Sequence, residues 1–90
     1  MKACTAEPGG IVLSRAGRDR NRAFVVVDVI DEAYVLIADG ALRTLQRPKK
    51  KKRKHLLDGS ETRMELGPHT LDADIRTFLR SQGFSNDRKE

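Results

Sequence analysis

Short β-branched runs separated by turn residues occupy the first half of this chain and constrain its fold more than any other feature. The strongest run, 24–30, is rich in valine, and β-branched and aromatic residues favour strands. Shorter apolar runs lie at 11–14 and 34–38. We expect a further brief strand at 42–45 and another at 53–57. Four or five strands so closely spaced are typical of a small β-barrel.

Two turn signals predict how consecutive strands are connected. Asp31-Glu32 leaves a gap short enough for an antiparallel hairpin, and Asp39-Gly40 is a strong tight-turn signal. Alternate residues of the strongest run share one face of a strand. The core face is therefore expected to carry Val25, Val27 and Val29, with Asp28 on the other face.

The C-terminal part of the chain predicts one amphipathic helix at 70–84. Thr70 or Asp72 can cap its N-terminus, and Gly83 followed by Phe84 fits a Schellman ending. The apolar stripe that recurs at helical spacing consists of Leu71, Ile75, Phe78 and Leu79.

The whole chain has 90 residues and makes one small domain. A chain this short buries only about 60–65% of its unfolded surface, so its core is small. That size argues against a two-domain enzyme, a doubly wound fold or a TIM barrel. The predicted organisation is a flexible N-terminal arm at 1–9, a barrel at 10–57, a linker at 58–69, a helix at 70–84 and a charged tail at 85–90.

Charge is segregated along the sequence. Residues 15–22 hold four arginines and one aspartate, a net of +3, and residues 43–54 hold eight bases and no acid, a net of +8. The total is +5, so the remainder of the chain carries −6. Two basic segments on an otherwise acidic chain indicate a polyanionic partner.

The arginine-rich loop at 15–22 is expected to present several guanidinium groups between two strands. Each can hold a phosphate through two hydrogen bonds or stack on a base. Gly17 would let the backbone approach a ligand, and Asn21 tolerates positive φ. The alternative interpretation of this loop is a solvated charged turn.

The lysine run at 49–54 has six consecutive bases. In a strand, alternate lysines point to opposite faces, so one set faces the core unless the strand lies at an edge. Edge strands carry lysines to prevent aggregation, but one or two are enough for that. Six neighbouring bases repel one another and are most easily explained if phosphates neutralise them.

Other classes of protein find little support in the sequence. The only cysteine is Cys4, so an internal disulfide and a multi-cysteine zinc site are excluded. His55 and His69 have too few companions for a metal site. No phosphate-binding glycine loop, paired-histidine helix or serine elbow is present. We expect no catalysis, cofactor, metal or small-molecule substrate, and no signal peptide or membrane span, in a cytoplasmic protein.

The arc from Gly10 to Asp28 resembles the KOW motif. A glycine precedes the first apolar strand, Gly17 opens a basic loop, and a second apolar strand follows. The later segments 34–40, 48–51 and 54–56 are similar to bacterial KOW-domain RNA-binding proteins. These in turn resemble KOW-containing large-subunit ribosomal proteins of archaea and eukaryotes. The resemblance covers roughly residues 9–57.

This resemblance implies an SH3-like β-barrel that contacts RNA, with a C-terminal helix added to it. Asn21 stands where the motif usually has glycine, and a further glycine expected near Phe24 is absent. The RNA-binding residues expected from the motif and the lysine run are Arg15, Gly17, Arg18, Arg20, Arg22, Arg43, Lys49, Lys50, Lys51, Lys52, Arg53, Lys54 and His55.

The function expected is therefore a non-catalytic, ribosome-associated RNA-binding domain active in translation, which contacts RNA through the basic KOW loop and a lysine-rich strand. Its partner would be structured RNA, in the first place ribosomal RNA of the large subunit, with ribosomal proteins as further contacts. Structured RNA is bound mostly through shape, phosphate and 2′-hydroxyl contacts, which suits a basic module with few aromatics. Two alternatives stay open: a protein-interaction module that uses an SH3-like barrel, and a transcription-associated KOW domain.

Overall fold

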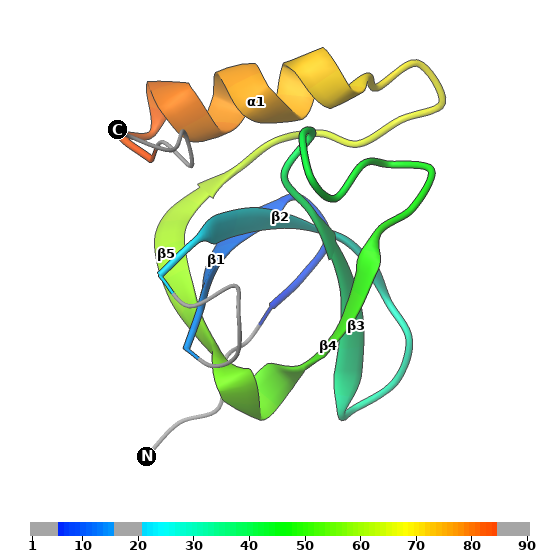
Figure 1. Ribbon diagram of the computed structural model, residues 1–90, viewed down its shortest axis with the longest axis vertical. Coiled ribbons are helices and arrows are strands. Elements are labelled where there is room, and N and C mark those ends of the chain that lie inside the picture. Colours follow the sequence, from blue (N-terminus) through cyan, green and yellow to red (C-terminus); the bar gives the residue numbers. More distant parts are fainter. Residues whose placement is uncertain (1–5, 16–20, 85–90) are drawn as a thin grey trace.

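The computed structural model describes residues 6–15 and 21–84, which form one antiparallel sheet and one helix. The sheet has the strand order β4-β3-β2-β1-β5 and curls around its own interior, with α1 packed outside it (Figure 1). The protein is thus mostly β. Within the described residues the edge strands β4 and β5 are not paired with each other, so the sheet is open and a closed barrel stays a prediction. The elements are β1 (Gly10–Ser14), β2 (Ala23–Val29), β3 (Tyr34–Ala38), β4 (Lys49–Lys52), the 3₁₀ turn η2 (Arg53–His55), β5 (Leu56–Arg63) and α1 (Asp72–Ser81).

Strand β2 is buried on both of its faces, which corrects the prediction of a single valine face. Phe24 and Val26 point into the curled sheet, whereas Val25 lies under α1. The register shifts between Val26 and Asp28, and this irregularity moves Val29 to the interior side. The interior cluster consists of Ala6, Val12, Phe24, Val26, Val35, Ile37 and Leu56. The cluster beneath the helix consists of Ile11, Ala23, Val25, Ala38, Ile75 and Leu79.

The predicted hairpin between β2 and β3 is confirmed. The two strands pair antiparallel, with Val26 opposite Ile37. The Asp31 carboxylate accepts hydrogen bonds from the amides of Ala33 (2.8 Å) and Tyr34 (2.9 Å), which closes the turn. An aspartate that accepts from amides two and three residues ahead is the usual way to stabilise such a turn.

The predicted turn at Asp39-Gly40 is also confirmed, and Gly40 has φ of 80°. A side chain there would be strained, and a Cβ would lie 2.4 Å from the carbonyl oxygen of Asp72 at the start of α1. Only glycine lets the helix approach this turn so closely.

Residues 42–45 form bends, not the brief strand that the sequence predicts. The reason is local, because the amides of Asp39 and Gly40 both donate to the carbonyl oxygen of Arg43. These bonds wrap the segment back on itself. The fourth strand is β4, the lysine run, which pairs antiparallel with β3.

The segment expected as a strand at 53–57 and a linker at 58–69 is organised differently. Residues 53–55 form the 3₁₀ turn η2, and β5 then continues to Arg63. β5 pairs with β1 over this length, with Leu57 opposite Leu13. Its polar residues are tolerated because an edge strand exposes much of its surface to water.

Residues 6–9, expected as part of a flexible arm, are packed against the sheet. Ala6 is 3% exposed. Gly9 bridges two strands, because its amide donates to the carbonyl of Val26 (2.7 Å) and its carbonyl accepts from the amide of Met64 (3.0 Å). Residues 1–5 and the predicted tail at 85–90 lie outside the described residues.

Helix α1 is confirmed but starts later than predicted, after Leu71. The two predicted caps are used elsewhere. The Thr70 hydroxyl accepts from the amide of Gly67 (2.8 Å), and the Asp72 carboxylate accepts from the amide of Leu45 (2.8 Å). Asp74, in the first turn, instead accepts from the amide of Leu71 (2.9 Å).

The predicted Schellman ending is confirmed. Gly83 has φ of 90°, and its amide donates to the carbonyl of Arg80 (3.0 Å). The amide of Phe84 donates to the carbonyl of Leu79 (2.9 Å), and the Phe84 side chain packs against the cluster beneath the helix. This is the pair of bonds that defines the motif.

Candidate nucleic-acid interface

The register of β4 divides its four lysines between the two faces of the sheet. Lys51 is opposite Val35, faces the interior and is 9% exposed. Lys49, opposite the buried Ile37, is half-buried on the same face. The remaining two, Lys50 and Lys52, lie exposed on the outer face. A continuous run of bases in the sequence thus provides only two outward-facing ammonium groups in the strand.

Tyr34, the first residue of β3, lies between these two outer lysines. It is opposite Lys52, and the Nζ atom of Lys50 sits 4.5 Å from the centre of its ring. A cation over an aromatic face contributes about 0.5–1 kcal/mol at an exposed site. Tyr34 is half-buried and carries the aromatic surface at this end of β3.

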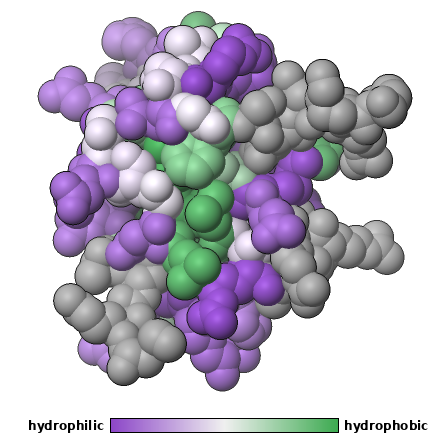
Figure 2. Space-filling model, turned by 90° about the vertical axis from the view of Figure 1, so that its left-hand side faces the viewer, coloured by the Kyte–Doolittle hydropathy of each residue, from purple (hydrophilic) through white to green (hydrophobic). Residues whose placement is uncertain are grey.

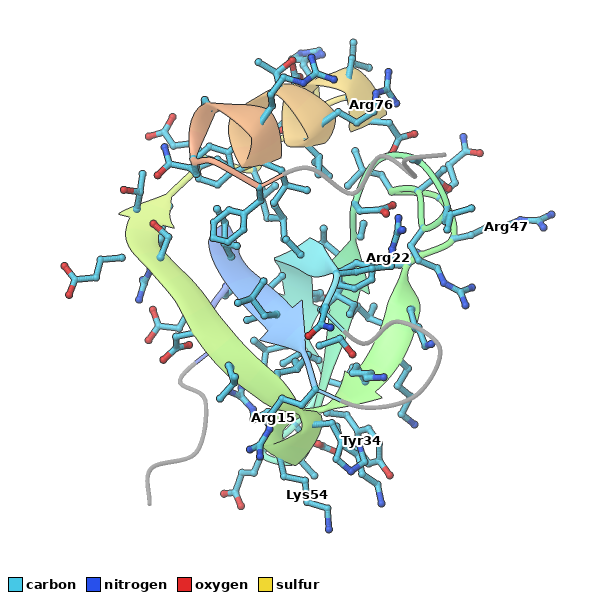
Figure 3. All side chains as sticks on the ribbon, turned by 60° about the vertical axis from the view of Figure 1, so that its left-hand side comes forward. Arg15, Arg22, Tyr34, Arg47, Lys54 and Arg76 are labelled. Atoms are coloured by element: carbon cyan, nitrogen blue, oxygen red, sulfur yellow. The ribbon has the colours of Figure 1, made fainter. Side chains whose placement is uncertain are left out.

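The 3₁₀ turn η2 brings two further basic side chains beside this outer face. The amide of Arg53 donates to the carbonyl of Ala33, next to Tyr34 (2.8 Å). The amide of Arg15 donates to the carbonyl of His55 (2.8 Å), which joins the end of β1 to the turn. Figure 3 shows Arg15, Tyr34 and Lys54 together at the end of the molecule farthest from α1.

We call this surface the basic end, and its cationic and imidazole side chains come from two separated parts of the chain, Arg15 and the segment 50–55. Four of them are exposed and His55 is half-buried. The salt bridges found among residues 6–15 and 21–84 join Arg22 to Asp39 and Arg63 to Glu7, and neither involves this surface. The basic end consists of Arg15, Lys50, Lys52, Lys54 and His55.

Acidic side chains border the basic end on the side of the β2–β3 turn. Asp28 is in register with Leu36, the neighbour of Lys50 on the outer face. Asp31 and Glu32 are exposed in the turn itself. A polyanion would therefore lie on the side of β4 and η2 and away from this turn.

Arg22, another predicted RNA contact, serves the interior of the fold. Its guanidinium donates to the Asp39 carboxylate at 2.7 Å, and the two side chains are 19% and 1% exposed. Burial opposes charge on Asp39, but amides of Arg43 and Ala41 and the Arg22 guanidinium outweigh it and lower the pKa of this carboxyl. We call Arg22, Asp39 and the 40–43 backbone around them the Asp39 cluster.

The other predicted RNA contacts are dispersed. The Arg53 guanidinium donates to the carbonyl of Ala6 (3.0 Å), which turns it toward the N-terminal segment. Arg43 is half-buried beside the Asp39 cluster. Arg22 lies nearer α1 than the basic end does, as do Arg47 and Arg76, two arginines outside the predicted set (Figure 3). Gly17, Arg18 and Arg20 lie outside the described residues.

The prediction from sequence did not include Tyr34 as a site residue. Residues near Tyr34 in the sequence do not indicate this role, because only the pairing of β3 with β4 places the ring between two lysines. Asn21, in contrast, adopts φ of 71° as its tolerance for this region suggests.

An apolar strip lies on the side of the molecule where β5 is found, with hydrophilic side chains around it (Figure 2). Leu13 and Leu57 face each other across β1 and β5, and Leu57 is 49% exposed. These two line a shallow depression together with Ser14, Arg15 and Asn21. Arg15 therefore joins the strip to the basic end.

Comparison with known proteins does not identify a function for this surface, so its interpretation depends on its residues. Neither the protein-family models nor the curated proteins give a match to this chain. In the part of the chain that the structure describes, no three His, Cys, Asp or Glu side chains gather as a metal site would require. The same residues contain no helix with the length and apolar character needed to cross a membrane.

Proposed function

We propose that this protein is a non-catalytic RNA-binding domain of the KOW type that docks on structured RNA, in the first place ribosomal RNA of the large subunit. The observation that carries the proposal is the basic end. Arg15 and the segment 50–55 meet there, and four exposed cations face solvent outside the two salt bridges described above: Arg15, Lys50, Lys52 and Lys54. Such a cluster repels itself and is stabilised when phosphates approach.

The order of the strands supports the finer part of this proposal, an SH3-like barrel. The sheet is a meander of β1 to β4 in which β5 returns to pair with β1, and η2 joins β4 to β5. In this arrangement Arg15, which directly follows β1, and the outer lysines of β4 both belong to the basic end. These are the two places from which the KOW resemblance expects RNA contacts.

The number of exposed cations at the basic end sets how strongly RNA binding should depend on salt. Lys50, Lys52 and Lys54 with Arg15 offer four cations, so about four phosphates can be neutralised. Each neutralised phosphate contributes about 0.7–0.9 to the slope of log affinity against log salt. We expect a slope of about −3. This salt dependence is much shallower than the one expected if all eight bases of 43–54 contacted phosphates.

The proposal is tested by two double variants that remove the same charge from different places. K52A/K54A takes two cations from the basic end, and R47A/R80A takes two exposed arginines from elsewhere. RNA affinity at low salt should fall about tenfold or more in the first, and its salt slope should become shallower by about two. Equal losses in both variants would mean that net charge alone, not this surface, attracts RNA.

The ribosomal part of the proposal is tested by sedimentation. Tagged protein in a cell lysate should migrate with large ribosomal subunits at low salt and leave them at high salt, because the contacts are ionic. Migration at the top of the gradient at both salt concentrations would contradict ribosome association, and crosslinking to RNA would then identify a smaller target.

A second candidate function, protein binding, is favoured by the Leu13–Leu57 strip. A half-buried and an exposed leucine beside cations suit a contact with a ribosomal protein at the edge of an RNA site. If the strip makes such a contact, Leu57→Ser should weaken co-sedimentation with subunits and leave affinity for naked RNA unchanged. An unchanged gradient profile would exclude this contact.

A further inference from the structure

We infer that Tyr34 stacks on one unpaired nucleobase of the bound RNA while the lysines around it hold the adjacent phosphates. This inference rests on the proposed function and specifies its ligand. The target would be RNA that presents an unpaired nucleotide, such as a bulge or a loop, beside the stretch of backbone held by the basic end.

The first argument is the fixed position of the tyrosine. Its carbonyl accepts hydrogen bonds from the amides of Ile30 (3.1 Å) and Asp31 (3.2 Å). Its own amide donates to the Asp31 carboxylate (2.9 Å). Three bonds on one residue hold the backbone of Tyr34 at the start of β3, so little order has to be gained when a ligand binds.

The second argument is the chemistry that surrounds the ring. Lys50 extends over the ring and Lys52 is opposite it in the register. A nucleotide has a flat base and an anionic phosphate a short distance apart, and this surface offers an aromatic face and ammonium groups in the same way. Aromatic side chains flanked by cations are the usual means of binding unpaired nucleotides.

The third argument concerns the position that Lys50 occupies. Its Nζ lies 4.5 Å from the ring centre, over the face that a base would use. A stacked base can improve affinity by about fivefold to a hundredfold, which exceeds what a solvated ammonium gains in the same place. The base would therefore replace the ammonium, and the flexible stem of Lys50 lets it turn toward a phosphate.

Base-paired RNA does not fit this position equally well. The bases of a duplex are stacked on one another, and proteins reach unpaired bases at loops, bulges and ends. Tyr34 is also the only tyrosine, and the chain has no tryptophan. A single aromatic platform suits one unpaired base rather than a long single strand.

The same composition makes the test direct, because the tyrosine emission of the protein comes from Tyr34 alone. We would titrate the full chain with a short oligouridylate and with an RNA duplex that has the same number of phosphates. Oligouridylate should quench the emission strongly and the duplex should not. Equal quenching by the two RNAs, or none by either while both bind, would overturn the stacking inference.

Variants separate stacking from packing. Tyr34→Leu keeps an apolar side chain on the strand without a ring, and Tyr34→Phe keeps the ring without the hydroxyl. By anisotropy of labelled RNA, the leucine variant should lose about fivefold or more in affinity for oligouridylate and little for the duplex. The phenylalanine variant should retain the wild-type affinity for both, and thermal melts should show that both variants are folded.

The outcomes also distinguish this inference from the proposed function. If wild-type protein binds neither RNA at low salt, the proposed function fails and the inference fails with it. If both RNAs bind but the leucine variant loses nothing on oligouridylate, only stacking is overturned. If both variants lose affinity equally, the hydroxyl rather than the ring is responsible, and stacking is again overturned.

Discussion

The Asp39 cluster and the basic end both contain cations, but the fold uses them in opposite ways. Arg22 meets a carboxylate that is 1% exposed, and amides of Ala41 and Arg43 donate to the same acid. At the basic end, Lys52 and Lys54 are exposed and take no part in the described salt bridges. The comparison teaches that an arginine in a basic loop and a lysine in a basic strand can have unrelated roles, which composition does not distinguish.

The largest effect on stability is expected when the acid is removed from the Asp39 cluster. Asp39→Ala leaves the partly buried Arg22 guanidinium and two amides without their acceptor. We expect a loss of about 3 kcal/mol in the free energy of unfolding, because a buried ion pair that loses one partner is costly. Urea denaturation measures it.

The control for that change is Asp28→Ala, which removes an exposed acid beside the basic end. It should alter stability by no more than about 0.5 kcal/mol. Equal losses in the two variants would show that the Asp39 cluster is not the structural centre that its hydrogen bonds indicate.

A second variant separates the approach of the helix from the ion pair. Gly40→Ala places a Cβ against the Asp72 carbonyl at a positive φ, so either the turn or α1 must move. We expect a loss of about 2 kcal/mol in the free energy of unfolding, in the middle of the range for backbone strain at one residue. Gly67→Ala, whose Cβ would meet nothing, is the matched control, and a similar effect of both would contradict this account.

Lowering the pH should destabilise the protein through the Asp39 cluster. The pKa of Asp39 is lower in the folded protein, so its contribution to stability is present above the ordinary aspartate pKa and is lost as pH falls through the folded value. Denaturation midpoints should therefore fall below about pH 4. In Asp39→Asn this part of the fall should be missing, and an unchanged pH profile in that variant would assign the acid sensitivity to other carboxylates.

The smallest effect we predict is a gain. Glu32→Lys turns an exposed acid at the border of the basic end into a cation. RNA affinity at low salt should rise about twofold to fivefold, and the salt slope should steepen by up to about one. Stability should change by no more than about 0.5 kcal/mol. A loss of affinity would place the bound RNA on another face.

Local signals in the sequence were sufficient for the parts of the fold that depend on neighbouring residues. The β2–β3 hairpin, the Asp39-Gly40 turn and the Schellman ending at Gly83 each follow from residues a few positions apart. The lysine-rich strand that the KOW resemblance implied is present as β4, which covers Lys49–Lys52. Charged residues have low strand propensity, so this strand depends on its pairing with β3. The extent of β5 was not predicted, because its partner β1 is distant in sequence.

The basic character of the candidate site could be predicted from the sequence, but the residues that form it could not. The sequence indicated alternation within the lysine run, and the register assigns Lys51 to the interior and Lys52 to the outer face. No local pattern distinguishes Arg22, which pairs with an acid far along the chain, from Arg15, which takes part in no salt bridge among residues 6–15 and 21–84. Tyr34 joins the site only through its neighbours on another strand.

The pairing of Gly10 with Arg63 sets an order for assembly. Hairpins β1–β2, β2–β3 and β3–β4 connect strands that follow one another, whereas β5 must return to the beginning of the chain. Long-range pairings of this kind form late, because closing a long loop costs entropy before contacts repay it. During synthesis, η2 reaches Arg15 only when β5 docks on β1, so the basic end would be completed only after the first four strands have been made.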